Sequence, residues 1–122
     1  MQILTGRKVF LSNAASRPIF GVQDLIWNEF YAGIKSASRF QIVGTPEEAD
    51  LVLEIGHSPI LRGTPAELSV RIVDPKTNVL LWQIWESVEL WNIQSTGRKN
   101  LDSAMAALLG DVTALATSPS SP

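Results

Sequence analysis

The stretch 68–91, LSVRIVDPKTNVLLWQIWESVELW, decides the fold because it holds two strands and the turn between them. Pro75 presets φ at the second turn position, Asp74 can accept hydrogen bonds from the amides of its own turn, and Asn78 tolerates the left-handed conformation that closes such loops. Apolar side chains flank the turn on both sides. The stretch therefore predicts a β-hairpin.

The predicted register of this hairpin is the one that makes one face of the two strands continuously apolar. Pairing Val73 with Val79 would place Val70 opposite Trp82, and the neighbouring pairs on that face would be apolar as well. On this register Trp82 is expected in the core, packed against a helix.

Outside the hairpin, changes in the period of the hydrophobic pattern predict the order β-α-β-β-β-β-α. The other predicted elements are strands at 8–12, 40–43 and 51–55, a helix from about 22 to 37, and a helix with Asn100 as its N-cap. The segment 45–48 has the form of a capping box and predicts one helical turn.

These elements predict a single-domain α/β sandwich of two to three layers over residues 1–116. Its sheet is expected to be mixed, with about five strands in the order 2-1-3-4-5 and two main helices. The segment 117–122 is rich in Ser and Pro and predicts a disordered tail.

Composition argues against several kinds of site. A net charge of −2 gives no electrostatic reason to expect nucleic acid as a partner. The chain has no Cys and a single His, so thiolate chemistry is excluded and a metal site lacks its ligands. We expect neither a metal nor a cofactor. The lack of Cys suits a reducing cytoplasm and an oxidising periplasm equally, so the cytoplasm stays open as a compartment.

The candidate binding residues of the hairpin are Leu81, Trp85 and Trp91. If both helices cover the other face of the sheet, these side chains lie on an open face or edge, and two Trp side chains approach the size of an interface patch. The predicted occupant is a protein partner or a second copy of the chain. Two alternatives stay open: the segments 56–66 and 92–100 could cover the Trp side chains, or these could form an aromatic platform for a sugar or single-stranded nucleic acid.

A second candidate site lies where loops would meet at one edge of the sheet. If the third strand runs parallel to the first, that edge gathers Asn13, His57 and Arg98, as in the open α/β sheets that bind small ligands there. The connection 44–50 is short for a parallel crossover, which argues against this arrangement. A lone His in a loop is more often a solvated residue than a general base, so no catalytic residue is assigned.

The segments PEEADLVL (46–53) and LSVRIVDPKTNVLLW (68–82) resemble small, uncharacterised bacterial envelope proteins of the lipoprotein type. The layout is also similar to the amino-terminal domain of TolB-type periplasmic proteins. The resemblance implies a periplasmic or envelope-associated module that binds other envelope components and performs no reaction of its own. The chain has Asn78 where those families usually have Gly. It shows neither a signal-like apolar segment nor a lipobox Cys, so membrane proximity would require an N-terminal anchor that has been removed.

Overall fold

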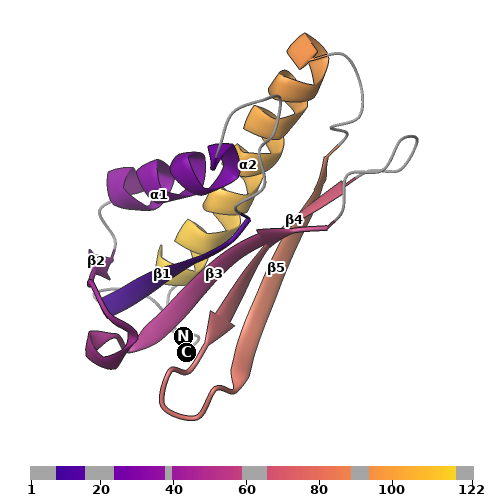
Figure 1. Ribbon diagram of the computed structural model, residues 1–122. Helices are drawn as coiled ribbons and strands as arrows, with labels where there is room; N and C mark the ends of the chain where they lie inside the picture. Colours follow the sequence, from indigo (N-terminus) through magenta and orange to yellow (C-terminus); the bar gives the residue numbers. More distant parts are fainter. Residues whose placement is uncertain (1–7, 16–23, 38–39, 59–65, 89–93, 118–122) are drawn as a thin grey trace.

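Five strands and two long helices form the part of the chain that the computed structural model describes, residues 8–15, 24–37, 40–58, 66–88 and 94–117 (Figure 1). In chain order the elements are β1 (Lys8–Ala14), α1 (Leu25–Ala37), β2 (Gln41–Ile42), the short 3₁₀ turn η1 (Pro46–Glu48), β3 (Leu51–His57), β4 (Ala66–Val73), β5 (Leu80–Val88) and α2 (Gln94–Thr117). The predicted order of elements is confirmed.

The strands form one mixed sheet in the order β2-β1-β3-β4-β5, as predicted. β1 is parallel to both β2 and β3, whereas β4 is antiparallel to both β3 and β5. The short connection between β2 and β3 is compatible with a parallel β1–β3 pair because Ile42, which ends β2, and Leu51, which begins β3, both pair with Val9 of β1. One edge of the sheet is the two-residue β2 and the other is the nine-residue β5.

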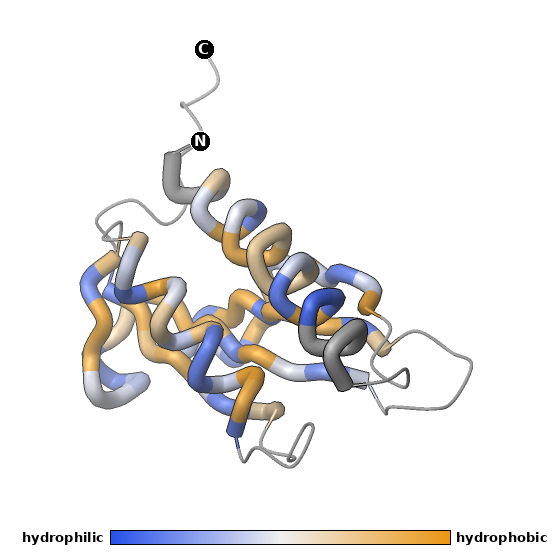
Figure 2. Tube along the Cα trace, turned by 90° about the horizontal axis from the view of Figure 1, so that it is seen from above, coloured by the Kyte–Doolittle hydropathy of each residue, from blue (hydrophilic) through white to orange (hydrophobic). Residues whose placement is uncertain are grey.

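The core lies between one face of the sheet and both helices (Figure 2), so the fold has two layers. We call this face the covered face and the opposite one the open face. Strand residues alternate between the faces, and those of β4 alternate between buried and more accessible along the strand. From the helices, Ile26, Phe30, Leu101 and Leu108 are fully buried. Burying each such side chain contributes about 1.5–3 kcal/mol.

The turn between β4 and β5 has the chemistry predicted for it. The Asp74 carboxylate accepts a 2.9 Å hydrogen bond from the Lys76 amide, and the Asn78 amide donates to the Asp74 carbonyl at 2.8 Å. Asn78 has φ of 59°, the left-handed conformation that Asn tolerates better than most residues.

The predicted register and the predicted burial of Trp82 are wrong. Trp82 pairs with Ile72 and Val70 pairs with Ile84, two residues away from the expected pairing, and a bulge between Ile72 and Val73 places Leu80 opposite Val73. Trp82 lies on the covered face, yet its side chain is 53% exposed. The reason is that α2 crosses the sheet obliquely and leaves the hairpin end of β5 uncovered (Figure 1).

Several predicted boundaries also differ from the structure. Helix α2 begins at Gln94, six residues before the predicted N-cap, and β1 and β3 run two residues further than predicted, to Ala14 and His57. The predicted turn at 46–48 forms, but the Thr45 hydroxyl donates to the Glu48 carboxylate at 3.0 Å and makes no hydrogen bond that caps the backbone. Residues 118–122 of the predicted tail lie outside the described residues.

Candidate functional site

The exposed apolar side chains of the described residues are concentrated on one strand. Apart from Tyr31 on α1, the large hydrophobic residues that are exposed belong to β5 or directly precede it, and each is 43–55% exposed: Val79, Leu80, Leu81, Trp82 and Trp85. β5 is also an edge of the sheet, so one side of its backbone has no neighbouring strand. Exposed edge strands of this length and hydrophobicity are pairing sites unless charges, prolines or a covering element protect them.

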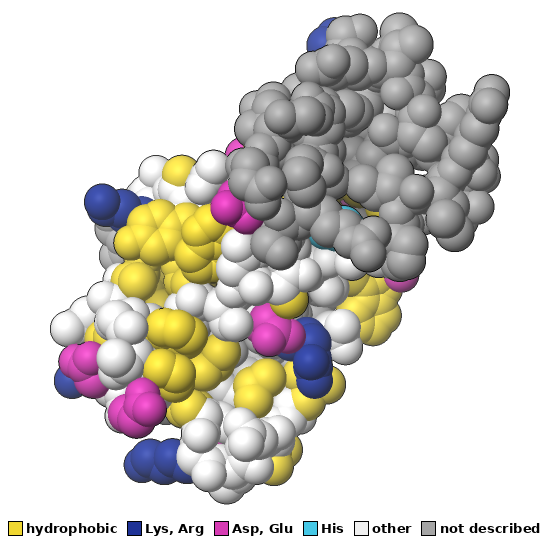
Figure 3. All heavy atoms as spheres, viewed as in Figure 1, with side chains coloured by type: hydrophobic (Ala, Val, Ile, Leu, Met, Phe, Trp, Pro, Cys, Tyr) yellow, Lys and Arg dark blue, Asp and Glu magenta, His cyan; other side chains and the backbone are white. Residues whose placement is uncertain are grey.

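The open face of the sheet carries ordered rows of side chains across its strands. One row is apolar, because Phe10 pairs with Val52, Val52 with Val73, and Val73 with Leu80. The next row is polar and contains an ion pair between Arg71 Nη1 and Glu54 Oε1 at 3.4 Å. In the view of Figure 3, hydrophobic side chains lie exposed among neutral and charged ones.

A groove of about 360 Å³ brings Trp85 of the predicted interaction face together with His57 of the predicted loop-edge site. Its lining residues define what we call the Trp85 groove: His57, Ser58, Glu67, Ser69, Gln83 and Trp85. Trp85 pairs with Ser69, and Ser69 pairs with Gly56, so the two strands beside the indole carry small residues in this row. The sequence prediction placed Trp85 and His57 in separate sites.

Asn13 and His57, from the predicted loop-edge site, make local hydrogen bonds. Asn13 Oδ1 accepts from the Ala15 amide at 2.8 Å, and Asn13 Nδ2 donates to the Asp24 carboxylate at 3.5 Å. His57 Nδ1 donates to the Ser58 carbonyl at 2.7 Å. These bonds hold the ends of β1 and β3 and do not form a catalytic pair.

Two of the six predicted site residues are not described in full. Trp91 lies outside the described residues. Arg98 belongs to the first turns of α2, but its side chain is not among those described. The roles of Leu81, Trp85, Asn13 and His57 as binding residues stay predictions, although the structure places all four at accessible positions.

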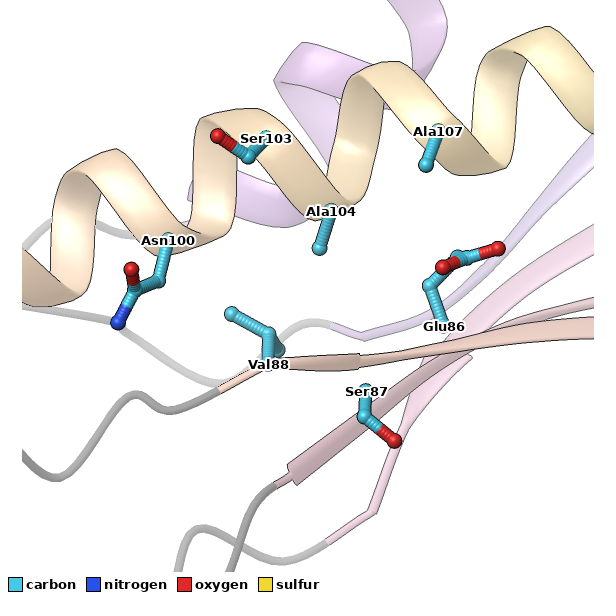
Figure 4. Close-up of a pocket in the computed structure, with 7 residues that line it drawn as sticks. All are labelled: Glu86, Ser87, Val88, Asn100, Ser103, Ala104 and Ala107. Atoms are coloured by element: carbon cyan, nitrogen blue, oxygen red, sulfur yellow. The ribbon is translucent and has the colours of Figure 1, made fainter.

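A second groove, which the sequence prediction missed, lies between β5 and α2 and has a volume of about 370 Å³ (Figure 4). We call it the edge groove, and its lining residues are Glu86, Ser87, Val88, Asn100, Ser103, Ala104 and Ala107. Glu86 and Val88 point from β5 toward the helix, while Ala104 and Ala107 point from α2 toward the strand. The helix side of this groove is built from small side chains, which leaves room next to the free edge of β5.

Glu86, which lines this groove, interacts with Asp111 of α2. A hydrogen bond from Glu86 to Asp111, with partial burial and the like charge of Asp111 adding to it, raises the pKa of the Glu86 carboxyl above its ordinary value. Glu86 is the only charged residue within β5.

The described residues contain neither a metal-site candidate nor a helix that could span a membrane. Among them, no group of three or more His, Asp and Glu side chains is placed to hold a metal ion. None of the described helices has the length and apolar composition needed to cross a membrane.

The fold is a two-layer α/β domain, and bacterial lipoproteins are among the solved structures that share it. No family model matches the chain, and no curated protein matches it in sequence. Solved structures do match in fold, at sequence identities of 12–15%.

Three of these structures show the extent of the likeness. PelC from Paraburkholderia phytofirmans, solved as a dodecamer, has a TM-score of 0.60 at 12% identity, over 98% of this chain and 94% of PelC. The uncharacterized lipoprotein B from Nitrosomonas europaea has a TM-score of 0.55 at 12% identity, over 94% of this chain and 87% of that one. The lipoprotein GNA1162 from Neisseria meningitidis has a TM-score of 0.52 at 15% identity, over 93% and 99%. The likeness to lipoproteins predicted from the sequence is thus supported at the level of the fold, and the likeness to TolB-type domains stays a prediction.

Proposed function

We propose that the protein is a non-catalytic binding or assembly module of a bacterial cell envelope, and that it acts through β5 and the adjoining open face of the sheet. The observation that carries the proposal is the concentration of exposed apolar side chains on this edge strand, with Leu81 and Trp85 among them. Monomeric soluble proteins rarely leave such a patch exposed unless it contacts another molecule.

Two further observations support the proposal. The fold is shared with bacterial lipoproteins and with PelC, which was solved as a dodecamer. The polar atoms of His57 and Asn13 make local hydrogen bonds that hold strand ends, which agrees with a binding module better than with an enzyme.

Site-specific photo-crosslinking in the native host tests this function. A photoreactive residue at Trp85 should give discrete protein adducts in the envelope fraction, whereas the same residue at Ala106 should give none. Ala106 is a matched control because it is exposed on α2 and is not among the residues that line the edge groove beside β5. Equal adducts from both positions, or none from Trp85, would contradict the proposal.

A second candidate function is the binding of a small polar ligand in the Trp85 groove. The groove combines one aromatic ring with polar groups from His57, Glu67 and Gln83, a combination that suits the alternating apolar and hydroxyl surfaces of a sugar ring. If this function is correct, Trp85→Ala and His57→Ala each weaken ligand binding. If the protein is an assembly module, only Trp85→Ala weakens association, by about 2 kcal/mol or more.

A further inference from the structure

We infer that two copies of the chain pair through their β5 edges in antiparallel register about Gln83, so that their sheets join into one. This inference rests on the proposed function and names the partner as a second copy of the chain. It is carried by three features of the described residues: the unprotected edge of β5, the self-complementary order of its side chains, and the edge groove beside it.

β5 has few of the usual devices that prevent edge pairing, and the bulge in its pairing with β4 lies near the hairpin end, between Ile72 and Val73. Its nine residues, LLWQIWESV, contain no Pro, no Lys or Arg, and one acidic residue near the end. The opposite edge of the sheet is formed by only two residues. Free backbone groups on a long apolar strand favour addition of another strand, with main-chain hydrogen bonds providing the attachment.

The order of side chains on β5 selects one register for a second copy. With the two-fold axis at Gln83, Trp82 of one copy lies opposite Ile84 of the other, and Leu81 lies opposite Trp85. Each pair occurs twice, so the interface is isologous. In this register Glu86 lies opposite Leu80, near the end of the strand, whereas moving the axis to Ile84 would place it opposite Trp82, a larger apolar side chain.

The exposure of Trp82 is explained by this arrangement. Trp82 and Ile84 pair with residues of the covered face, Ile72 and Val70, so both point to the side of the sheet on which the helices lie. In the pair of copies, Trp82 stands beside Ile84 of the other copy and within reach of its diagonal neighbour Glu86. That position is the mouth of the other copy's edge groove, where Ala104 and Ala107 leave space.

The amount of surface is sufficient for a reversible pair. The half-exposed side chains of β5 present on the order of 400 Å² of apolar surface on each copy, given the area of a Trp side chain. The two strands and the groove lining add polar area, which brings the contact toward the roughly 800 Å² per partner of a standard interface.

Disulfide trapping tests the register directly, because the chain has no Cys of its own. In the inferred pair, residue 83 of one copy faces residue 83 of the other with Cα atoms about 4.5–5.5 Å apart, within the range that a disulfide spans. Gln83→Cys should therefore form a covalent dimer under mild oxidation. Ser87→Cys is the matched control: it is exposed on the same strand, but the two copies of residue 87 would lie eight strand positions apart.

Solution mass provides the second measurement. Light scattering across a dilution series should show a concentration-dependent dimer for the wild type, and Trp82→Ser should weaken it about 30-fold or more, as expected for an interfacial Trp. Tyr31→Ser, which removes an exposed aromatic side chain from α1, should leave the dimer unchanged. Circular dichroism of each variant checks that it is folded.

The outcomes separate this inference from the proposed function. A monomeric wild type, or covalent dimers of Gln83→Cys and Ser87→Cys in equal yield, would overturn the pairing. If crosslinking from Trp85 still captured a different protein under those conditions, the binding function would stand and the second copy would be the wrong partner.

Discussion

A methyl group at Gly33 in α1 would collide with α2, and Gly33→Ala therefore measures how closely the helices pack. The added Cβ would overlap Leu109 Cδ1 and lie 2.9 Å from Cδ2 and 3.1 Å from Cγ. Replacing a helical Gly by Ala ordinarily stabilises a helix by about 1 kcal/mol, but overpacking costs about 1–3 kcal/mol. We expect Gly33→Ala to lower the free energy of unfolding by about 1 kcal/mol.

The chain provides both a control and a suppressor for this change. Gly110 lies within α2, and a Cβ there would have no atom within 4 Å, so Gly110→Ala should raise the free energy of unfolding by about 1 kcal/mol. In a Leu109→Ala background the collision is removed, and Gly33→Ala should become stabilising by a similar amount. Urea denaturation followed by circular dichroism measures each difference. If Gly33→Ala stabilised the wild type as much as Gly110→Ala does, the inferred contact between the helices would be wrong.

Three further changes test the core, the turn and the acidic pair. Leu53→Ala, at a fully buried position of β3, should lower the free energy of unfolding by about 2–5 kcal/mol in urea denaturation. Asn78→Val should lower the thermal midpoint because a β-branched residue is strained at positive φ, whereas Asn78→Gly should not lower it. The raised pKa of Glu86 means that its favourable contribution is complete below the ordinary value of 4.5 and is lost as the pH rises through the raised pKa. Glu86→Gln should therefore stabilise the protein by about 0.5 kcal/mol at pH 7 and by much less near pH 4, and an equal effect at both would contradict the assignment.

Local chemistry explains which parts of the fold could be predicted from the sequence. The turn at 74–78 depends on the torsion preferences of Pro75 and Asn78 and on the Asp74 carboxylate, all of which act within a few residues. The helix between β1 and β2 is marked in the same local way by the spacing of its apolar residues. The pairing of β3 with β1 joins segments far apart in the chain, so the predicted strand order was confirmed without a local signal that required it.

The register of β5 could not be read in the same way. Both faces of β5 carry apolar residues: Leu80, Leu81, Trp82, Ile84 and Trp85. The sequence therefore has no alternation of apolar and polar residues that would distinguish one pairing from another shifted by two residues. The burial of Trp82 depends on the oblique path of α2, which is a long-range property of the packing. The edge groove also depends on long-range packing, because its walls come from β5 and α2. Neither segment alone has a sequence pattern that predicts the groove.

The early start of α2 has a different cause. The residues before Asn100 are polar, and a method that follows the spacing of apolar side chains cannot detect a helical turn that contains none. Gly97 lowers the helix propensity of that turn by about 1 kcal/mol without ending the helix.

The unequal edges of the sheet limit how large an assembly built by strand addition can become. Once two copies have joined through β5, both ends of the enlarged sheet are β2 strands of two residues each. A strand this short offers too few backbone groups to recruit another chain. The β5 edge can accept another strand and the β2 edge cannot. Association by strand addition would therefore stop at two copies and would not continue into a fibre.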